Sequence, residues 1–327
     1  MIAYISIFLF SIAVTFIFSH FLIPRLKRFG IIGKDVNKPG NPEVAEMGGF
    51  AIVAGFSAGV FLAVFFNTFF GFHFNLIFIL ASLLTVYVIS FIGILDDLLD
   101  IPQWLKAIVP LFAAVPLIAV EAVGNTSMFI PFFGEIEFGI FYILLLIPLG
   151  VAVSSNLTNM LAGFNGMEAG MGIVIFSFAS ILAYISGNTE PLILFIPIIG
   201  ALLAFSYFNW YPAKVFPGDI GNLTIGGILA CGVIIGNMES IGAMLLILYV
   251  LDFFIKLYNK FPSKNWWGEY RDGKLYPPEN KVRGLAQFIM KKFNGISEKN
   301  LTLVFIFLQI FVGLFVLSYF LYFKTFF

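Results

Sequence analysis

Three aspartates give the first indication of chemistry in this chain. Asp96, Asp97 and Asp100 follow directly on a long apolar run, in the segment FIGILDDLLD. In a helix Asp100 shares a face with the other two, which lie three and four residues before it. Three acidic groups on one face repel one another unless a cation or a basic group lies between them. The residues alone leave two interpretations open: an acidic helix end in water, or a site for a metal ion or a phosphate.

A second polar segment, SSNLTNMLAGFNGMEAG, is rich in amides. Asn156 and Asn159 are three residues apart and share a helical face, and Asn165 precedes a glycine that permits a turn. Neutral amides suit hydroxyls, an amide substituent or a base edge, or one ligand position on a hard cation. Helix capping explains any one of them. With Glu168 in the same thirteen residues, we interpret the segment as part of a substrate site.

Three further residues stand where loops meet helices. Asp219 follows a Pro-Gly turn in FPGDIGNLTIGG; it is either an N-cap, which contributes ~1 kcal/mol, or a metal ligand. Glu46 precedes a pair of glycines, where backbone can lie close to a ligand. Lys106 begins a helix nine residues after Asp97. It either snorkels to the membrane surface or pairs with the carboxylates and holds a phosphate.

The last polar segment, FPSKNWWGEYRDGKLYPPENKVRG, contributes Lys264 and Arg271 as candidate diphosphate contacts. The chain has two histidines. His20 lies within the first apolar run, and His73 lies in a loop that we expect on the other side of the membrane from these polar segments, so zinc chemistry based on histidine is disfavoured. No Walker A, GxSxG or HExxH pattern occurs. Carboxylates, amides and a few basic groups instead favour Mg²⁺ holding a phosphorylated substrate.

The composition shows what must position these residues. Of 327 residues, 60% are apolar and 11% charged, whereas soluble domains carry about 25% charged residues. The sequence therefore predicts an all-α polytopic membrane protein. Zero net charge implies no attraction to nucleic acid, and one cysteine excludes a disulfide framework. The first apolar stretch is long enough to span and has no basic region before it, so we expect a transmembrane helix instead of a signal peptide.

We expect ten spans in one integral-membrane domain, 1–327. The apolar runs cover about 2–23, 48–67, 75–95, 105–123, 138–158, 168–187, 190–208, 220–237, 239–257 and 301–323. The connections on one side are 24–47, 96–104, 154–167, 209–219 and 258–300, and all but one of the 18 Lys and Arg residues lie in or beside them. The positive-inside rule makes these loops cytoplasmic and both termini external. On the other side, 128–138 predicts a small hairpin.

FIGILDDLLD, NLTNMLAGFNGMEAG and FPGDIGNLTIGG, in this order and on one face, resemble the polyprenyl-phosphate N-acetylhexosamine-1-phosphate transferases. The resemblance covers nearly the whole chain and is strongest to the archaeal and eukaryotic members that use UDP-N-acetylglucosamine and dolichyl phosphate. It implies ten helices and one reaction: the lipid phosphate attacks the β-phosphorus of the nucleotide sugar, UMP leaves, and lipid-diphosphate-N-acetylglucosamine remains. In the eukaryotic members this is the first membrane step of lipid-linked oligosaccharide assembly for N-glycans.

The resemblance also implies roles for individual residues. Asn159 and Asp219 would bind Mg²⁺ (or Mn²⁺). Asp96 and Asp97 would lie by the lipid phosphate, with Lys106 as a phosphate-binding lysine. Asn156 and Asn165 would contact the nucleotide, and Glu46 matches an acidic residue in the first loop. The last loop departs from the family, because it lacks the bacterial histidines and the eukaryotic Arg-His-Arg cluster; Lys264 and Arg271 would substitute there.

Two other classes of function remain open on the sequence. One is a transferase of the same fold that uses another UDP-sugar or undecaprenyl phosphate. The other is a secondary transporter, although transport sites tend to lie near the midplane and these acidic groups lie at one face. A purely structural role fits the polar loops poorly. Compact loops and few cysteines suit a prokaryotic plasma membrane, or the endoplasmic reticulum in a eukaryote, and a homodimer is compatible with the sequence.

Overall fold

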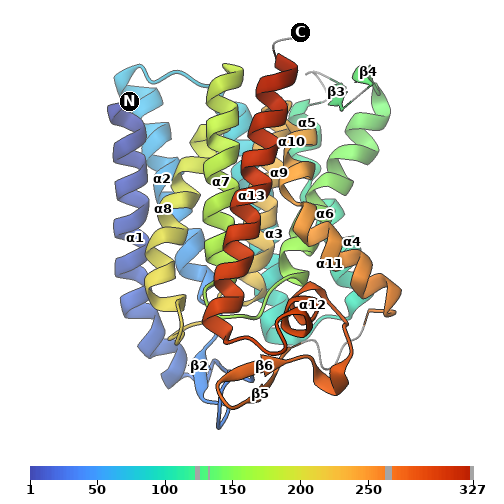
Figure 1. Cartoon of the computed structure of the whole chain (residues 1–327). Helices are drawn as coiled ribbons and strands as arrows, with labels where there is room; N and C mark the ends of the chain where they lie inside the picture. Colours follow the sequence, from blue (N-terminus) through green and yellow to red (C-terminus); the bar gives the residue numbers. More distant parts are fainter. Residues whose placement is uncertain (122–125, 132, 262–266, 325–327) are drawn as a thin grey trace.

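The computed structural model describes all residues except 122–125, 132, 262–266 and 325–327. The chain forms a bundle of roughly parallel and antiparallel helices, with both termini at one end (Figure 1). Within the described residues, nine helical segments are long and apolar enough to cross a membrane, and a bent pair makes a tenth span if it crosses as one. The predicted all-α polytopic fold is confirmed.

The long helices follow the predicted apolar runs. They are α1 (Ile2–Arg28), α2 (Gly49–Phe70), α3 (Leu76–Leu99), α4 (Gln103–Ala113) with α5 (Val115–Glu121), the π-helix η1 (Tyr142–Leu146) with α6 (Ile147–Met160), α7 (Met167–Ser186), α8 (Leu192–Asn209), α9 (Gly218–Ile235), α10 (Glu239–Leu245) with α11 (Ile247–Tyr258), and α13 (Glu298–Lys324). Between the last two lies the short helix α12 (Leu285–Lys292). The axes of α10 and α11 differ by 63°.

Several helices extend further into the predicted loops than the apolar runs do. Helix α3 continues through Asp96 and Asp97 to Leu99, and its C-cap Asp100 has φ 49°. Helix α6 continues past two serines to Met160, so Asn156 and Asn159 stand on its last turns. The helices run on through these polar residues because the backbone hydrogen bonds of a helix do not depend on apolar side chains. The candidate functional side chains are therefore fixed on rigid helices.

In the part of the chain that the structure describes, three short antiparallel hairpins lie at the ends of the bundle. Strands β1 (Ile32–Lys34) and β2 (Glu43–Ala45) pair in the first long loop, and β5 (Glu269–Arg271) pairs with β6 (Lys274–Tyr276) in the last. Both lie at the end opposite the termini, and the β5–β6 hairpin is packed against α12 (Figure 1). Strands β3 (Ser127–Ile130) and β4 (Gly134–Glu137) form the predicted hairpin at the end that carries the termini.

Helix α9 forms the centre of the bundle, and every residue from Ile220 to Ile235 is buried. Two glycines let its neighbours approach closely. A Cβ on Gly93 of α3 would lie 2.5 Å from the Cα of Ile220, and a Cβ on Gly226 would overlap the carbonyl oxygen of Ser154 in α6. The close packing brings the ends of α3 and α6 against the start of α9, which is where the candidate site lies.

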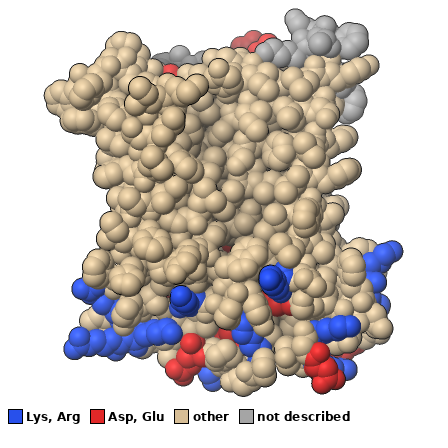
Figure 2. Space-filling model, turned by 60° about the vertical axis from the view of Figure 1, so that its left-hand side comes forward, with Lys and Arg blue, Asp and Glu red and all other residues tan. Residues whose placement is uncertain are grey.

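Lys and Arg side chains gather at one end of the molecule. On the face that Figure 2 shows, they form a band at the end that carries the β1–β2 and β5–β6 hairpins, and few charged side chains lie above this band. The polar segments singled out from the sequence lie at this same end.

Candidate functional site

The adjacent aspartates Asp96 and Asp97 have different partners. Asp97 accepts hydrogen bonds from the backbone N–H groups of Asp219 (2.8 Å, to Oδ1) and Ile220 (3.2 Å, to Oδ2). A helix leaves its first N–H groups unpaired, and a carboxylate there also interacts favourably with the helix dipole. Asp97 of α3 therefore caps α9. The side chain of Asp219 makes no capping bond, so the N-cap interpretation of Asp219 is wrong and its carboxylate is free to face the site.

Lys106 joins the other carboxylates into one cluster. Its Nζ lies 2.6 Å from Oδ2 of Asp96 and 3.5 Å from Oδ2 of Asp219. Asp96 also accepts from the backbone N–H of Ile101 (3.0 Å) and is almost fully buried, whereas the Asp219 side chain is 26% exposed. The carboxylates of Asp96 and Asp219 thus face one ammonium group, and that of Asp97 lies next to them at the start of α9. The cluster carries an excess of negative charge that a cation would balance.

The amides of α6 border this cluster. Asn156 donates to the backbone oxygens of Ala152 (2.8 Å) and Lys106 (3.2 Å). Asn159 accepts at Oδ1 a hydrogen bond from Nδ2 of Asn222 (3.2 Å). Asn222 was not singled out from the sequence, although its place one turn after Asp219 was a usable signal.

Glu46 also lies near the cluster. It is close enough to Asp97 for the two carboxylates to repel, and its side chain lies against Gly33, where a Cβ would collide with it. Burial raises the pKa of the Glu46 carboxyl above its usual range. The structure therefore brings together Glu46 with the residues of α3, α4, α6 and α9.

A second polar network lies under the loops at the same end of the bundle. The ammonium group of Lys38 contacts the carboxylate of Asp35, Oδ1 of Asn165 (2.7 Å) and Oε2 of Glu298 (2.9 Å). Asp35, Asn165 and Glu298 are each at most 4% exposed. The network joins the first loop, the loop before α7 and the start of α13.

Asn165 is the centre of this network. Its side chain donates to Asp35 (3.1 Å) and accepts from the backbone N–H of Ala213 (2.7 Å); its backbone N–H donates to Glu298 (2.9 Å), and its carbonyl accepts from Thr302 (3.0 Å). These bonds hold the loops that flank α9 and α7. The amide of Asn165 therefore stabilises the loops. A direct contact of Asn165 with a nucleotide stays a prediction.

Two other predicted substrate contacts, Glu168 and Arg271, have their partners outside the carboxylate cluster. The buried carboxylate of Glu168 accepts from the backbone N–H of Gly163 and so holds the loop before α7. Arg271 forms an ion pair with Glu269 (2.7 Å) on the exposed β5–β6 hairpin. Lys264 lies outside the described residues. Whether either basic residue binds a diphosphate stays a prediction.

Like the pairs of Lys38, a buried ion pair of α11 was missed from the sequence. Asp252 and Lys256 of α11 pair at 2.8 Å, and Asp252 also accepts from the backbone N–H of Leu285 at the start of α12 (2.7 Å). Lys256 also donates to the carbonyl of Met160, the last residue of α6. Two opposite charges four residues apart within an apolar span were the available signal.

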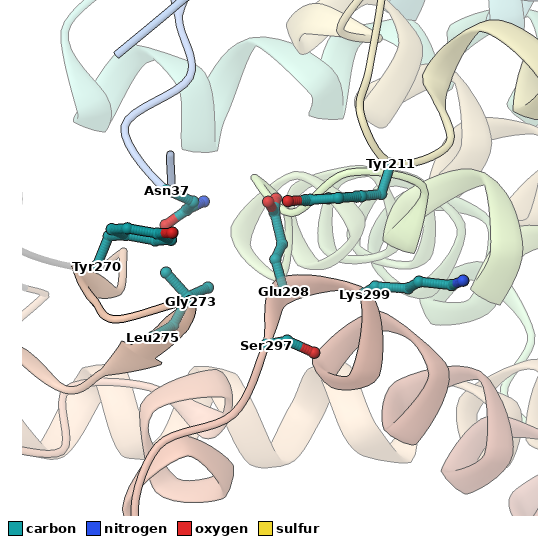
Figure 3. A pocket seen from close by; sticks show the side chains of 8 residues that line it. All are labelled: Asn37, Tyr211, Tyr270, Gly273, Leu275, Ser297, Glu298 and Lys299. Atoms are coloured by element: carbon teal, nitrogen blue, oxygen red, sulfur yellow. The ribbon is translucent and has the colours of Figure 1, made fainter. Parts of the chain in front are cut away.

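A cavity of about 250 Å³ lies between the first loop, the β5–β6 hairpin and the start of α13. In Figure 3, Tyr270 and Asn37 stand on one side of it and Tyr211 and Glu298 on the other, while the side chain of Lys299 points away. None of the carboxylates of the α3–α9 cluster lines this cavity.

The donor set limits what the site can bind. Among the described residues no group of three or more His, Cys, Asp or Glu side chains could hold a metal ion. A cation near Asp219 would therefore need amide oxygens or substrate oxygens as well, which is the donor set that Mg²⁺ prefers. The geometry fits a charged, oxygen-rich substrate held at a membrane surface.

The comparisons agree with this class of site. Residues 79–237 match the family described as glycosyl transferase family 4, and the chain belongs to this family. It is 39% identical over 288 residues to a Saccharolobus solfataricus protein named "Putative UDP-N-acetylglucosamine--dolichyl-phosphate N-acetylglucosaminephosphotransferase", covering 86% of each chain. A Sulfolobus acidocaldarius protein of the same name is 35% identical, over 85% of this chain and 84% of that one.

A bacterial relative is similar over a shorter region. The phospho-N-acetylmuramoyl-pentapeptide-transferase of Clostridium perfringens strain 13 is 32% identical over 206 residues, which cover 54% of this chain and 64% of that protein.

Proposed function

We propose that this protein transfers N-acetylglucosamine-1-phosphate from UDP-N-acetylglucosamine to a polyprenyl phosphate of the dolichyl type and releases UMP. The observation that carries the proposal is the cluster in which Lys106 lies between Asp96 and Asp219, next to the α9 cap formed by Asp97. Two anionic substrates must meet at such a site, so both an ammonium group and a divalent cation are useful there.

The cluster lies on the cytoplasmic side in this proposal. Two observations support it: Lys and Arg side chains gather at this end of the face that Figure 2 shows, and both termini lie at the other end (Figure 1). Cytoplasmic loops carry an excess of Lys and Arg. A soluble nucleotide sugar would therefore reach the site from the cytoplasm.

The residues present fit a Mg²⁺ ion. The cluster has more carboxylates than ammonium groups, Asp219 is partly exposed, and the buried amide oxygen of Asn222 has no hydrogen-bond partner. Asp219 and Asn159 would hold the ion, and Mn²⁺ would suit the same oxygen donors. When bound, the ion neutralises charge on the diphosphate and orients it.

The protein residues supply position and charge. Lys106 lies where it can bind a phosphate oxygen and compensate the charge that develops as UMP leaves. Asp96 fixes the ammonium group of Lys106 through a 2.6 Å ion pair. Asp97 fixes the first turn of α9 and so the position of Asp219. Two substrates held in this geometry react with much less loss of entropy than free ones.

An apolar cavity near the site provides room for a lipid chain. It has a volume of about 230 Å³, is lined by residues of η1, α6, α9, α10 and α11, and begins at Leu157, two residues before Asn159. At its far end Tyr142 and Glu239 contact each other. A prenyl chain needs apolar surface next to a site for its phosphate, and this cavity supplies it.

The purified protein tests the proposal directly. UMP release is measured with UDP-N-acetylglucosamine and dolichyl phosphate, with Mg²⁺ and with EDTA, and the lipid product is detected by mass spectrometry. We expect turnover that needs both substrates and the cation. Lys106→Met should lower kcat by at least about a hundredfold, as loss of one charge-stabilising group does in other enzymes.

The controls separate the alternatives. Undecaprenyl phosphate and UDP-N-acetylgalactosamine replace one substrate at a time; faster turnover with either would assign a different lipid or sugar. Absence of UMP release with every polyprenyl phosphate would refute the enzyme proposal and leave a transporter to be tested by uptake into proteoliposomes.

A further inference from the structure

Asn222 of α9 has an unusual pattern of hydrogen bonds. Its side chain is buried, its Nδ2 donates to Oδ1 of Asn159 (3.2 Å), and its Oδ1 has no partner. A buried polar atom without a partner costs about 1–3 kcal/mol. The function proposed above notes this unpaired oxygen but assigns the cation only to Asp219 and Asn159, so Asn222 has no role of its own yet.

The surroundings place this oxygen donor at the junction of α6 and α9. Asn222 lies one turn after Asp219, on the same face of α9. Its backbone carbonyl accepts a hydrogen bond from Thr158 of α6 (2.8 Å), the residue before Asn159. Asn159 and Asn222 are therefore in contact, and Asp219 stands one turn before Asn222 on the same face of α9.

The spacing of the two amides matches that of neighbouring ligands of a magnesium ion. Mg²⁺ binds oxygens at about 2.0–2.1 Å in octahedral geometry, which places two adjacent ligand oxygens about 3 Å apart. Nδ2 of Asn222 lies 3.2 Å from Oδ1 of Asn159. A half-turn of the Asn222 amide about its last side-chain bond exchanges its nitrogen and oxygen, and then two amide oxygens face the same point at this spacing.

We propose that Asn222 is a third protein ligand of the divalent cation, beside Asp219 and Asn159. The proposal rests on the cation of the proposed function. After the half-turn it gives the amide oxygen of Asn222 a partner, and it adds a ligand without adding charge to a cluster that already holds three carboxylates. It also explains how a cation is held where no group of three or more His, Cys, Asp or Glu side chains is available among the described residues.

The test measures binding of Mn²⁺ to the full-length protein in detergent by electron paramagnetic resonance, with and without UDP-N-acetylglucosamine. Asn222→Leu has a similar shape and no polar atom, and we expect it to weaken Mn²⁺ binding about tenfold or more, since even groups behind the ligands change metal affinity by 10–100-fold. Asn222→Asp restores an oxygen and adds a charge, and we expect it to bind Mn²⁺ at least as tightly as the unchanged protein. Electron spin-echo spectroscopy in D₂O should show additional water on Mn²⁺ in Asn222→Leu.

A control variant tests for general damage to α9. Thr224→Val removes another buried polar group of α9, which bonds to Ser90 of α3 at 2.7 Å. We expect it to leave Mn²⁺ affinity unchanged, while thermal unfolding shows whether either variant is destabilised.

The outcomes separate the two proposals. Unchanged Mn²⁺ affinity in Asn222→Leu overturns the ligand assignment alone. Equal weakening by Asn222→Asp and Asn222→Leu also overturns it, because the amide then acts as a donor that orients Asn159. A protein that binds no Mn²⁺ under any condition overturns the cation of the proposed function together with this ligand.

Discussion

The ammonium group of Lys38 holds three loops together, and its removal should be costly. Its Nζ donates to three polar groups of the network, Asp35, Asn165 and Glu298, and also lies over the ring of Tyr211. The side chain of Lys38 is 9% exposed and those of the two acidic partners 2%. Lys38→Met keeps most of the apolar stem but leaves two carboxylates buried without a cation.

The size of the effect follows from this burial. Removal of one partner from a buried ion pair costs about 3–5 kcal/mol because the other charge stays buried and unpaired. Lys281→Met is a matched control, because the Lys281–Glu279 pair has a similar length (3.0 Å) and both side chains are exposed. Exposed pairs contribute little, so we expect the control to unfold like the unchanged protein.

Equilibrium unfolding in mixed micelles with increasing SDS measures the difference. We expect Lys38→Met to lose about 3 kcal/mol or more and to bind UDP-N-acetylglucosamine more weakly in calorimetry, because the network positions the loops before α7 and α9. Neutralisation of both acidic partners in the same variant, with Asp35→Asn and Glu298→Gln, should restore part of the stability. If Lys38→Met and Lys281→Met unfold alike, the network does not hold these loops.

Three further variants test separate parts of the structure. Gly150 faces the apolar cavity, and a Cβ there would meet only Ile234, at 4.0 Å. Gly150→Leu should weaken the apparent affinity for the lipid about tenfold, ~1.4 kcal/mol, and leave the affinity for the nucleotide unchanged. Leu149→Phe, at an exposed position, is the control in the same assays. Burial raises the pKa of the Glu46 carboxyl, so its charged form destabilises the fold above the usual pKa of a glutamate. Glu46→Gln should therefore be more stable than the unchanged protein at pH 7 and lose this advantage below about pH 4. An advantage that persists at low pH in SDS titrations would contradict this reasoning. Asp97→Asn directs an NH₂ group at a backbone N–H of α9 and should cost about 1–3 kcal/mol in the same titrations; an unchanged stability would exclude the capping role.

The sequence was sufficient for the fold and for the carboxylate cluster. Apolar runs identify spans because every backbone polar group in a bilayer must pair within its own helix. Asp96 and Lys106 are ten residues apart on consecutive helices, so a short connection almost enforces their contact. Asp219 was assigned to the same cluster because all polar loops were expected at one end of the bundle, and the structure confirms this placement.

The second polar network, around Lys38 and Asn165, could not be predicted in the same way. Lys38 and Glu298 are 260 residues apart, and neither position differs in type from ordinary charged residues at a membrane surface. Asn165 was noticed for its chemistry, but nothing in its spacing distinguishes a ligand contact from a bond to Asp35 and Ala213. Such pairings depend on how the loops fold over the helix ends, and local patterns do not contain this information.

The adjacent aspartates illustrate why the positions of neighbours matter for function. Successive residues of a helix point about 100° apart, so Asp96 and Asp97 cannot face the same partner. Asp96 faces Lys106, and Asp97 faces the N-terminus of α9. Because Asp97 occupies the capping position, Asp219 does not have to fold back on its own helix and can face the cluster. A change at Asp96 should therefore alter the charge state around Lys106, whereas a change at Asp97 should displace Asp219 as well. If Asp97 also acts on the lipid phosphate, it must do so while it caps α9, and its two roles are separable only by comparing the stability of its variants with their turnover.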